Sequence, residues 1–301
     1  MIPIALVTGF LGSGKTALLQ HLARTLRDRR IIYLVNEFSA VDVDGHVLAE
    51  ETQDVVELPG GSVFCRCLVT DFIQTLTDIP ERFGADGSVD GVVIEASGVA
   101  NPRVVAKMLR ETRLDELYAL STIVTVIDPG TFPLLLKALP NIRAQVDAGD
   151  VAVINKTDLY DAQTVEQAEA LVREIRPEIA CVRTVRGEVD LPVFGPAPER
   201  ALDGEYAPCA DPNFARMVIH PRGEVSIEAL RRTLEDARDI VYRLKGFVRA
   251  DGRWMHVDYS AAAFTARPLE READRADLVL IGRGDAGTQL QALADALRGD
   301  A

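Results

Sequence analysis

The run from Gly9 to Thr16 has the residue types and the spacing that phosphate binding requires. It reads G-F-L-G-S-G-K-T, a full match to G-x-x-x-x-G-K-[ST] between an apolar run and a helical one. Its glycines let backbone N–H groups turn inward around phosphate oxygens, while Lys15 adds a positive charge for the β- and γ-phosphates and the Thr16 hydroxyl ligates Mg²⁺. The expected nucleotide-binding residues here are Gly9, Gly12, Ser13, Gly14, Lys15 and Thr16.

A second motif indicates which base is bound. Asn155-Lys156-Thr157-Asp158 follows the apolar strand 151–154 and reads N-K-T-D, similar to the guanine-reading element of P-loop GTPases. A buried Asp158 carboxylate would accept hydrogen bonds from guanine N1–H and the exocyclic amine, a donor pair that adenine lacks. Asn155 would bind the base edge or tie this loop to the phosphate loop, and the stem of Lys156 would cover the ring. We therefore expect GTP rather than ATP.

Two segments between these motifs have the features of switch elements. Residues 92–98 read V-V-I-E-A-S-G, an apolar strand that ends at Glu95 and is followed by a turn; residues 35–44 read V-N-E-F-S-A-V-D-V-D. Glu95 can hold a magnesium-bound water or orient the attacking water, and Gly98 can donate its N–H to the γ-phosphate. The expected catalytic groups are Lys15, Glu95 and Gly98, and the expected ligands of Mg²⁺ or its waters are Thr16, Glu37 and Glu95.

The elements that must position these residues follow an alternating pattern. Short apolar runs are separated for the most part by helical segments, the clearest of which carries Leu18, Leu22 and Leu26 on one face. This alternation predicts an α/β fold, a P-loop NTPase domain with a mostly parallel sheet and its ligand site at the carboxyl ends of the strands. The strands are expected at 2–8, 31–35, 55–58, 89–94, 121–127, 151–154 and 179–182.

A smaller α+β domain is predicted at the C-terminal end. Residues 195–212 hold four prolines and two glycines without apolar periodicity, which is typical of a linker. Strands are expected beyond it at 215–220, 240–247, 254–259 and 278–281, with a helix at 227–237 and a final one through Leu290, Leu293 and Leu297. The predicted domains are therefore 1–194 and 213–301, joined by the linker 195–212.

Composition restricts the partners. A formal net charge of −13 over 301 residues disfavours nucleic acid or an anionic membrane as the main partner. The first residues lack the basic start of a secretory signal, and no apolar run reaches membrane-spanning length, so we expect a cytoplasmic protein. Four cysteines do not make a disulfide framework in a chain of this size, which indicates reduced thiols.

Taken together, the motifs resemble the CobW-type metallochaperone GTPases, a metal-handling branch of the P-loop GTPases. The resemblance extends into the last third, through K-G-F-V at 245–248 and L-V-L-I-G-R at 278–283, which look like that family's C-terminal domain. It implies Mg-dependent GTP hydrolysis coupled to delivery of Zn²⁺ or Co²⁺ to a client metalloprotein. A second copy of the chain, in a nucleotide-dependent homodimer, is an alternative partner. The supporting runs in the first two thirds lie at 9–16, 36–39, 94–102 and 155–158.

The expected metal element departs from the family pattern, which is usually C-x-C-C between the first switch and the acidic strand. Residues 58–67 read L-P-G-G-S-V-F-C-R-C, so that Ser62 and Phe64 stand where the first two cysteines would be, while Cys65 keeps its place and Cys67 is an extra thiol. We expect Cys65 and Cys67 as transition-metal ligands, with buried or inert thiols as the alternative. A closed tetrahedral site needs two more ligands, for which Glu37, His46 or a client residue are candidates.

Two other functions use the same phosphate site. A GTPase that assembles or activates a metal- or corrinoid-dependent enzyme, without metal cargo of its own, would explain the altered cysteine element and the absence of histidine from the linker. A small-molecule kinase would need a second substrate pocket and would usually read adenine, which the N-K-T-D run disfavours.

Overall fold

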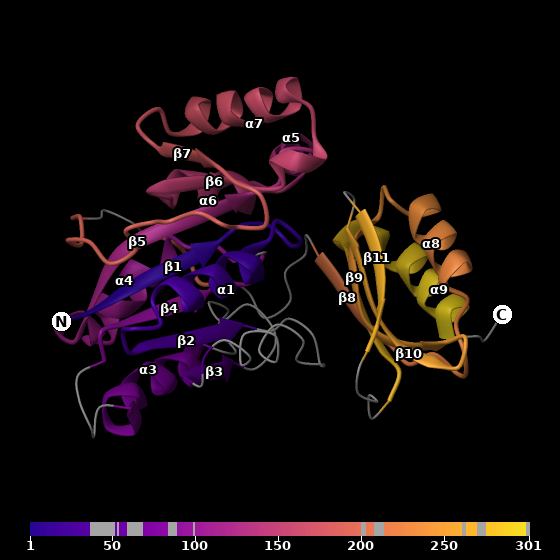
Figure 1. Cartoon of the computed structure of the whole chain (residues 1–301), viewed down its shortest axis with the longest axis horizontal. Helices are drawn as coiled ribbons and strands as arrows, with labels where there is room; N and C mark the ends of the chain where they lie inside the picture. The colour runs from indigo at the N-terminus through magenta and orange to yellow at the C-terminus, as the bar shows by residue number, and fades with distance from the viewer. Residues whose placement is uncertain are drawn as a thin grey trace. The chain divides into compact units, whose positions relative to one another are not determined.

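The computed structural model describes residues 1–36, 52, 54–58, 69–83, 89–98, 100–199, 203–207, 214–260, 263–269 and 275–298. The described residues up to 207 form one compact unit, and those from Phe214 onward form another (Figure 1). None of the helices in these ranges has the length and apolarity needed to cross a bilayer.

Seven described strands of the first unit form one sheet in the order β3-β2-β4-β1-β5-β6-β7, and every pairing is parallel. Each was predicted from the sequence to within a few residues, and the predicted α/β fold class is confirmed. The strands are β1 (Ile2–Thr8), β2 (Ile31–Asn36), β3 (Val55–Leu58), β4 (Gly91–Glu95), β5 (Tyr118–Ile127), β6 (Val151–Ile154) and β7 (Ala180–Arg183).

Helices cover both faces of this sheet (Figure 1). Alternate residues of β1 enter different cores: Ile4 and Leu6 pack with helices α3 and α4, whereas Ala5 and Val7 pack with α1. Burial on both faces explains the continuous apolar runs of these strands. The helices are α1 (Lys15–Thr25), α3 (Val69–Phe83), α4 (Val104–Glu111), α5 (Phe132–Ala138), α6 (Pro140–Ala148) and α7 (Ala162–Ile175).

Parallel pairing brings the strand ends, and the loops after them, to one edge of the sheet. Val7 is in register with Glu95, and Ile127 with Ile154. The residues that immediately follow β1, β4, β5 and β6 therefore share that edge, which is where open α/β sheets bind ligands.

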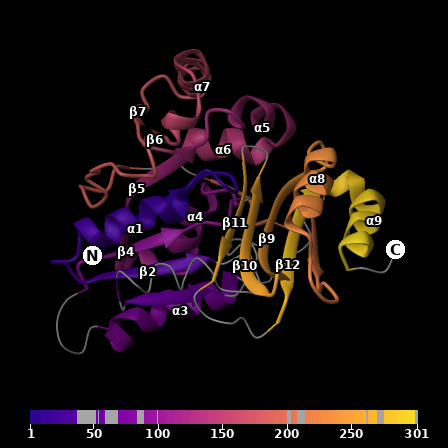
Figure 2. The same ribbon diagram turned by 45° about the vertical axis from the view of Figure 1, so that its right-hand side comes forward.

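The second unit is a five-stranded antiparallel sheet in the order β11-β10-β9-β12-β8. Helices α8 and α9 lie on one of its faces, where Leu230, Leu234 and Leu290 are buried (Figure 2). Its elements are β8 (Phe214–Ile219), α8 (Ile227–Asp236), β9 (Val241–Ala250), β10 (Arg253–Ser260), β11 (Ala263–Pro268), β12 (Asp277–Arg283) and α9 (Gly287–Arg298).

Strand β11 was missed by the sequence analysis. It reads A-F-T-A-R-P and pairs only with β10 among the described strands, with mostly exposed side chains. An edge strand needs no apolar alternation, and its proline is tolerated there, so the sequence carries little signal for it.

Part of the stretch expected to be a linker lies against the first unit. Asp203 pairs with Lys107 at 3.4 Å, and Tyr206 donates its hydroxyl to Glu111 at 2.8 Å. Both partners belong to α4. The pKa of Tyr206 is raised to about 12, mainly because the hydroxyl is buried and secondly because it bonds Glu111.

Candidate functional site

The loop between β1 and α1 has three glycines with positive φ, at positions 9, 12 and 14. Gly9 and Gly14 have φ angles of +135° and +103°, which L side chains rarely adopt. A Cβ on Gly9 would lie 2.2 Å from the Val126 carbonyl oxygen, and one on Gly14 would lie 2.1 Å from Asn155 Nδ2. The backbone of this loop is thus packed directly against the neighbouring strand ends, with Gly14 at the N-terminus of α1.

The lysine of the loop is buried beside an acid. Lys15 Nζ donates to the carbonyls of Gly9 at 3.0 Å and Phe10 at 3.4 Å, and lies 3.9 Å from a carboxylate oxygen of Glu95. The side chains of Lys15 and Glu95 are each 6% exposed. Removing both charges from water is expensive, so their retention at a strand edge fits a site that handles a charged ligand better than it fits packing alone. Thr16 follows as the second residue of α1 and is half-buried.

Buried hydroxyls border the same loop. The side-chain oxygens of Thr8, Ser13 and Ser97 have no hydrogen-bond partner among the described residues, although each residue is at most 2% exposed. Buried polar groups in folded proteins are almost always bonded. Thr8 precedes the glycine loop, Ser13 lies in it, and Ser97 follows the acidic strand, so their free capacity fits an oxygen-rich anion bound at this loop.

The turn after β4 contacts the glycine loop. A Cβ on Gly98 would lie 2.5 Å from the backbone nitrogen of Leu11, so a larger residue would force the two segments apart. This contact places Gly98 beside the loop that carries Lys15.

Asn155 joins the two predicted halves of the site. It is 1% exposed, its Nδ2 donates to the Ser13 carbonyl at 2.9 Å, and its Oδ1 accepts the Gly187 N–H at 2.9 Å. Of the two roles that the sequence allowed for Asn155, the structure shows the tie between loops.

The next residues of the motif differ in exposure: Lys156 is partly buried, whereas Asp158 is exposed. Lys156 has a left-handed backbone with φ of +58°, and its Nζ binds Asp128 Oδ2 at 2.8 Å. Asp158 lies in a short 3₁₀ segment, Thr157–Leu159, and is exposed. The structure therefore does not bury the Asp158 carboxylate, contrary to the expectation from the sequence.

Sequence reasoning missed Asp128 and Gly187. Asp128 follows β5 directly, as Asn155 follows β6, and Glu95 is the last residue of β4, so a polar residue at the end of an apolar strand was the available signal. Gly187 has φ of +70°, and a Cβ there would lie 2.6 Å from the backbone nitrogen of Leu18. Glycine is thus required where the loop after β7 meets α1.

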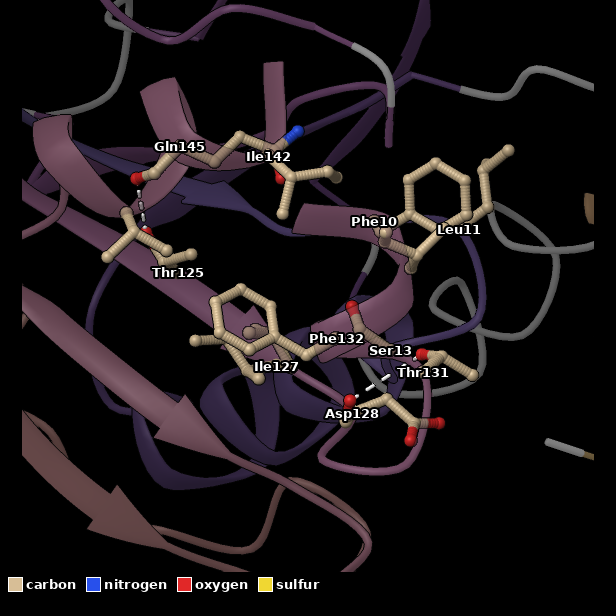
Figure 3. Close-up of a pocket in the computed structure, with 13 residues that line it drawn as sticks. Phe10, Leu11, Ser13, Thr125, Ile127, Asp128, Thr131, Phe132, Ile142 and Gln145 are labelled. Atoms are coloured by element: carbon tan, nitrogen blue, oxygen red, sulfur yellow. Dashed lines mark hydrogen bonds between the residues drawn. The ribbon is translucent and has the colours of Figure 1, made fainter. Parts of the chain in front are cut away.

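A pocket opens beside the glycine loop (Figure 3). Phe10, Leu11 and Ser13 line it from the loop, together with Asp128 at the end of β5 and Phe132 and Leu135 of α5. On its far side, Gln145 and Ile142 come from α6. The pocket shows that the strand edge, the glycine loop and α6 converge at one place.

The predicted transition-metal ligands cannot be located. Glu37, His46, Cys65 and Cys67 lie outside the described residues. Within the described ranges no three Cys, His, Asp or Glu side chains gather in a way that could hold a metal ion. Burial raises the pKa of the Cys181 thiol on β7, which favours its neutral form.

Comparisons with known families match both units. A family model described as "CobW/HypB/UreG, nucleotide-binding domain" matches residues 3–183, and one described as "Cobalamin synthesis protein cobW C-terminal domain" matches residues 214–298.

Similar proteins include two curated relatives and one solved structure. The chain is 27% identical to the zinc chaperone CobW of Pseudomonas aeruginosa, over 94% of this chain and 88% of the relative. It is 25% identical to the zinc-regulated GTPase metalloprotein activator 1 of Dictyostelium discoideum, over 63% of this chain but only 47% of that relative. The structure of the Zn(II)-bound YjiA GTPase from E. coli aligns over 99% of each chain, with 20% identity and a TM-score of 0.48.

Proposed function

Because the chain belongs to the CobW/HypB/UreG family of nucleotide-binding domains, we propose that it is a GTPase whose cycle controls the handling of a transition metal, zinc first. Metal delivery to a client metalloprotein, dependence on Mg²⁺ and carriage of Co²⁺ are parts of this proposal. A cytoplasmic location stays a prediction.

The observation that carries the nucleotide part is the bridge made by Asn155. One buried amide bonds both the glycine loop, through Ser13, and the loop after β7, through Gly187. A nucleotide needs a phosphate cradle at one end and a base-reading element at the other. Here the protein itself holds the two together.

The residues of the site have separate roles in binding and hydrolysing GTP. Lys15 exchanges the carbonyls of Gly9 and Phe10 for phosphate oxygens, and Gly98 donates its N–H to the γ-phosphate. Glu95 orients the attacking water. Asp158 receives the guanine edge, and its exposed position leaves it accessible to the base.

The oxygen donors near Lys15 fit Mg²⁺, a hard cation that binds oxygen ligands and keeps several waters. Thr16 would ligate it directly, and Glu95 would hold one of its waters; Glu37 is a further candidate outside the described residues. When bound, Mg²⁺ neutralises charge on the β- and γ-phosphates.

In this proposal zinc is the cargo, and Cys65 and Cys67 are its ligands. The names of the curated relatives motivate this assignment, since both refer to zinc. In this proposal the nucleotide state changes the affinity of Cys65 and Cys67 for the metal.

Zinc titration of the GTPase tests the metal part. Wild-type protein is titrated with a zinc chelator as competitor, once with Mg²⁺ and a non-hydrolysable GTP analogue and once with Mg²⁺ and GDP. We expect the two zinc affinities to differ by about 10-fold or more, a coupling of about 1.4 kcal/mol. Cys65→Ser with Cys67→Ser should abolish zinc binding, whereas the matched control Cys181→Ser should retain it. Equal zinc affinities in the two nucleotide states would contradict control of metal binding by the nucleotide.

The altered cysteine element favours a second candidate. With Ser62 and Phe64 in place of cysteines, the protein would act as a GTPase that activates a metal- or corrinoid-dependent client without carrying metal. Client activation that survives the double cysteine-to-serine change would support this function and contradict metal delivery.

A further inference from the structure

A glutamine on α6 holds the turn that follows the acidic strand. The side-chain Nε2 of Gln145 donates to the carbonyl of Gly98 at 3.1 Å and to that of Ala100 at 3.2 Å. The backbone carbonyl of Gln145 accepts the Thr125 hydroxyl at 2.8 Å (Figure 3). One residue therefore links the turn to α6, and α6 to β5.

Packing alone does not explain a glutamine at this position. Gln145 is 1% exposed, and its neighbours on the buried face of α6, Ile142 and Val146, are apolar. Burying an amide costs desolvation and the freedom of a long side chain, and a leucine of similar size would avoid the desolvation and lose less freedom. Both N–H groups of Gln145 instead bond backbone carbonyls of one turn, which fixes the orientation of that turn.

The turn it holds carries the groups that face the phosphates in the proposed function. Gly98 lies against the backbone nitrogen of Leu11, and the preceding hydroxyl of Ser97 is buried without a partner among the described residues. The turn begins directly after Glu95. Its position is set on one side by the glycine loop and on the other by Gln145, at the pocket that both of them line (Figure 3).

We propose that Gln145 is a positioning residue for GTP hydrolysis. By binding the carbonyls of Gly98 and Ala100, it keeps the Gly98 amide and the Ser97 hydroxyl in place beside the glycine loop for contact with the γ-phosphate. GDP lacks that phosphate, so its binding does not depend on Gln145. This inference rests on the proposed GTPase function.

The first test is Gln145→Leu, which keeps the size of the side chain and removes both donors. We expect kcat for GTP to fall about 10- to 100-fold, as small misplacements of catalytic groups do, while the Kd for GDP changes less than about 2-fold. The matched control is Thr125→Val, which removes the bond to the Gln145 backbone carbonyl and leaves the amide in contact with the turn. Its kcat should stay within about 2-fold of wild type.

The second test is Gln145→Glu assayed against pH. A carboxylate cannot donate to the two carbonyls, whereas a protonated carboxyl group donates one hydrogen bond, and burial raises the pKa of such a group into the assay range. The ratio of variant to wild-type kcat should therefore rise several-fold as the pH falls from about 8 to about 5.5. This test also applies if the leucine variant does not fold.

The outcomes separate the two proposals. Absence of GTP hydrolysis by the wild-type protein overturns the proposed function itself. Wild-type hydrolysis with an unchanged kcat in Gln145→Leu, or a pH-independent ratio in Gln145→Glu, overturns the role of Gln145 alone. A lower melting temperature with equal losses of GTP and GDP affinity assigns Gln145 to stability and contradicts positioning.

Discussion

At the phosphate end of the site, the hydroxyls of Thr8, Ser13 and Ser97 are buried without partners among the described residues. At the base end, Asn155 and Lys156 are both bonded to the protein, with N···O distances of 2.8 to 2.9 Å to their partners. The first end keeps its bonding capacity for a ligand, whereas the second uses that capacity to hold its own loops.

This difference predicts different consequences of mutation. A change at the phosphate end should affect the affinity for anything that carries phosphates and leave the base end in place. A change at the base end should affect the placement of loops, and so reduce both nucleotide affinity and stability.

The largest effect is expected for Lys15→Ala. Loss of a buried, bonded charge costs about 2–5 kcal/mol, so GTP affinity should fall by about 30-fold or more, with a similar loss for inorganic pyrophosphate. Isothermal titration calorimetry with both ligands measures this. Lys107→Ala, which removes a lysine paired with Asp203, is the matched control. Unchanged pyrophosphate binding in Lys15→Ala would contradict the assignment of the phosphate end.

Asn155→Ala should have the next largest effect. It leaves the Ser13 carbonyl and the Gly187 N–H unbonded in a buried region, at about 1–3 kcal/mol each. GTP and GDP affinity should fall together by about 10-fold, and the melting temperature by several degrees. Calorimetry and a thermal melt without nucleotide measure the two effects. A loss of affinity for GTP alone would place Asn155 in catalysis rather than in the bridge.

Asp128→Asn should have a smaller and more local effect. It replaces the ion pair with Lys156 by a hydrogen bond from the same ammonium group to a neutral amide oxygen, a difference of about 1 kcal/mol, so GTP affinity should fall about 3- to 10-fold. Pyrophosphate affinity should not change, because the phosphate loop is untouched. Equal losses for the two ligands would show that the two ends are not separable.

The smallest effect on the site is expected for Glu169→Gln on α7. A hydrogen bond from Arg183 is the main cause that lowers the pKa of Glu169, against the opposing effect of burial. Because the pKa is lower in the folded state, the carboxylate stabilises the fold at neutral pH, and this contribution is lost as the pH falls through the lowered value. Denaturant unfolding should show a deficit for the variant at pH 7 that shrinks as the pH falls below the ordinary glutamate pKa of about 4.3. GTP affinity should not change.

The strands of the first unit could be predicted because burial on both faces produces uninterrupted apolar runs, as in β1 and β4. The edge strand β11 could not, since its exposed side chains carry no such pattern. The boundary between units was harder to read, because residues 203–207 have the composition of a linker but contact α4 through Asp203 and Tyr206.

Within the site, the sequence identified residues that belong to a motif. It did not identify residues that act by holding another residue in place. Lys15 and Asn155 occur at fixed spacings that ligand chemistry imposes. Asp128 and Gln145 act through Lys156 and Gly98, from elements whose proximity depends on the fold. No spacing along the chain could indicate those contacts.

Guanine recognition by Asp158 is the central claim, and a base-exchange measurement tests it most directly. Xanthine has a carbonyl where guanine has the exocyclic amine, so an asparagine amide can bond xanthine where an aspartate bonds guanine. Hydrolysis of GTP, XTP and ATP is measured for wild type and Asp158→Asn. We predict that wild type prefers GTP over both other nucleotides, and that the variant prefers XTP over GTP by about 10-fold or more. Equal use of GTP and ATP by wild type, or an unchanged preference for GTP in the variant, would contradict this account.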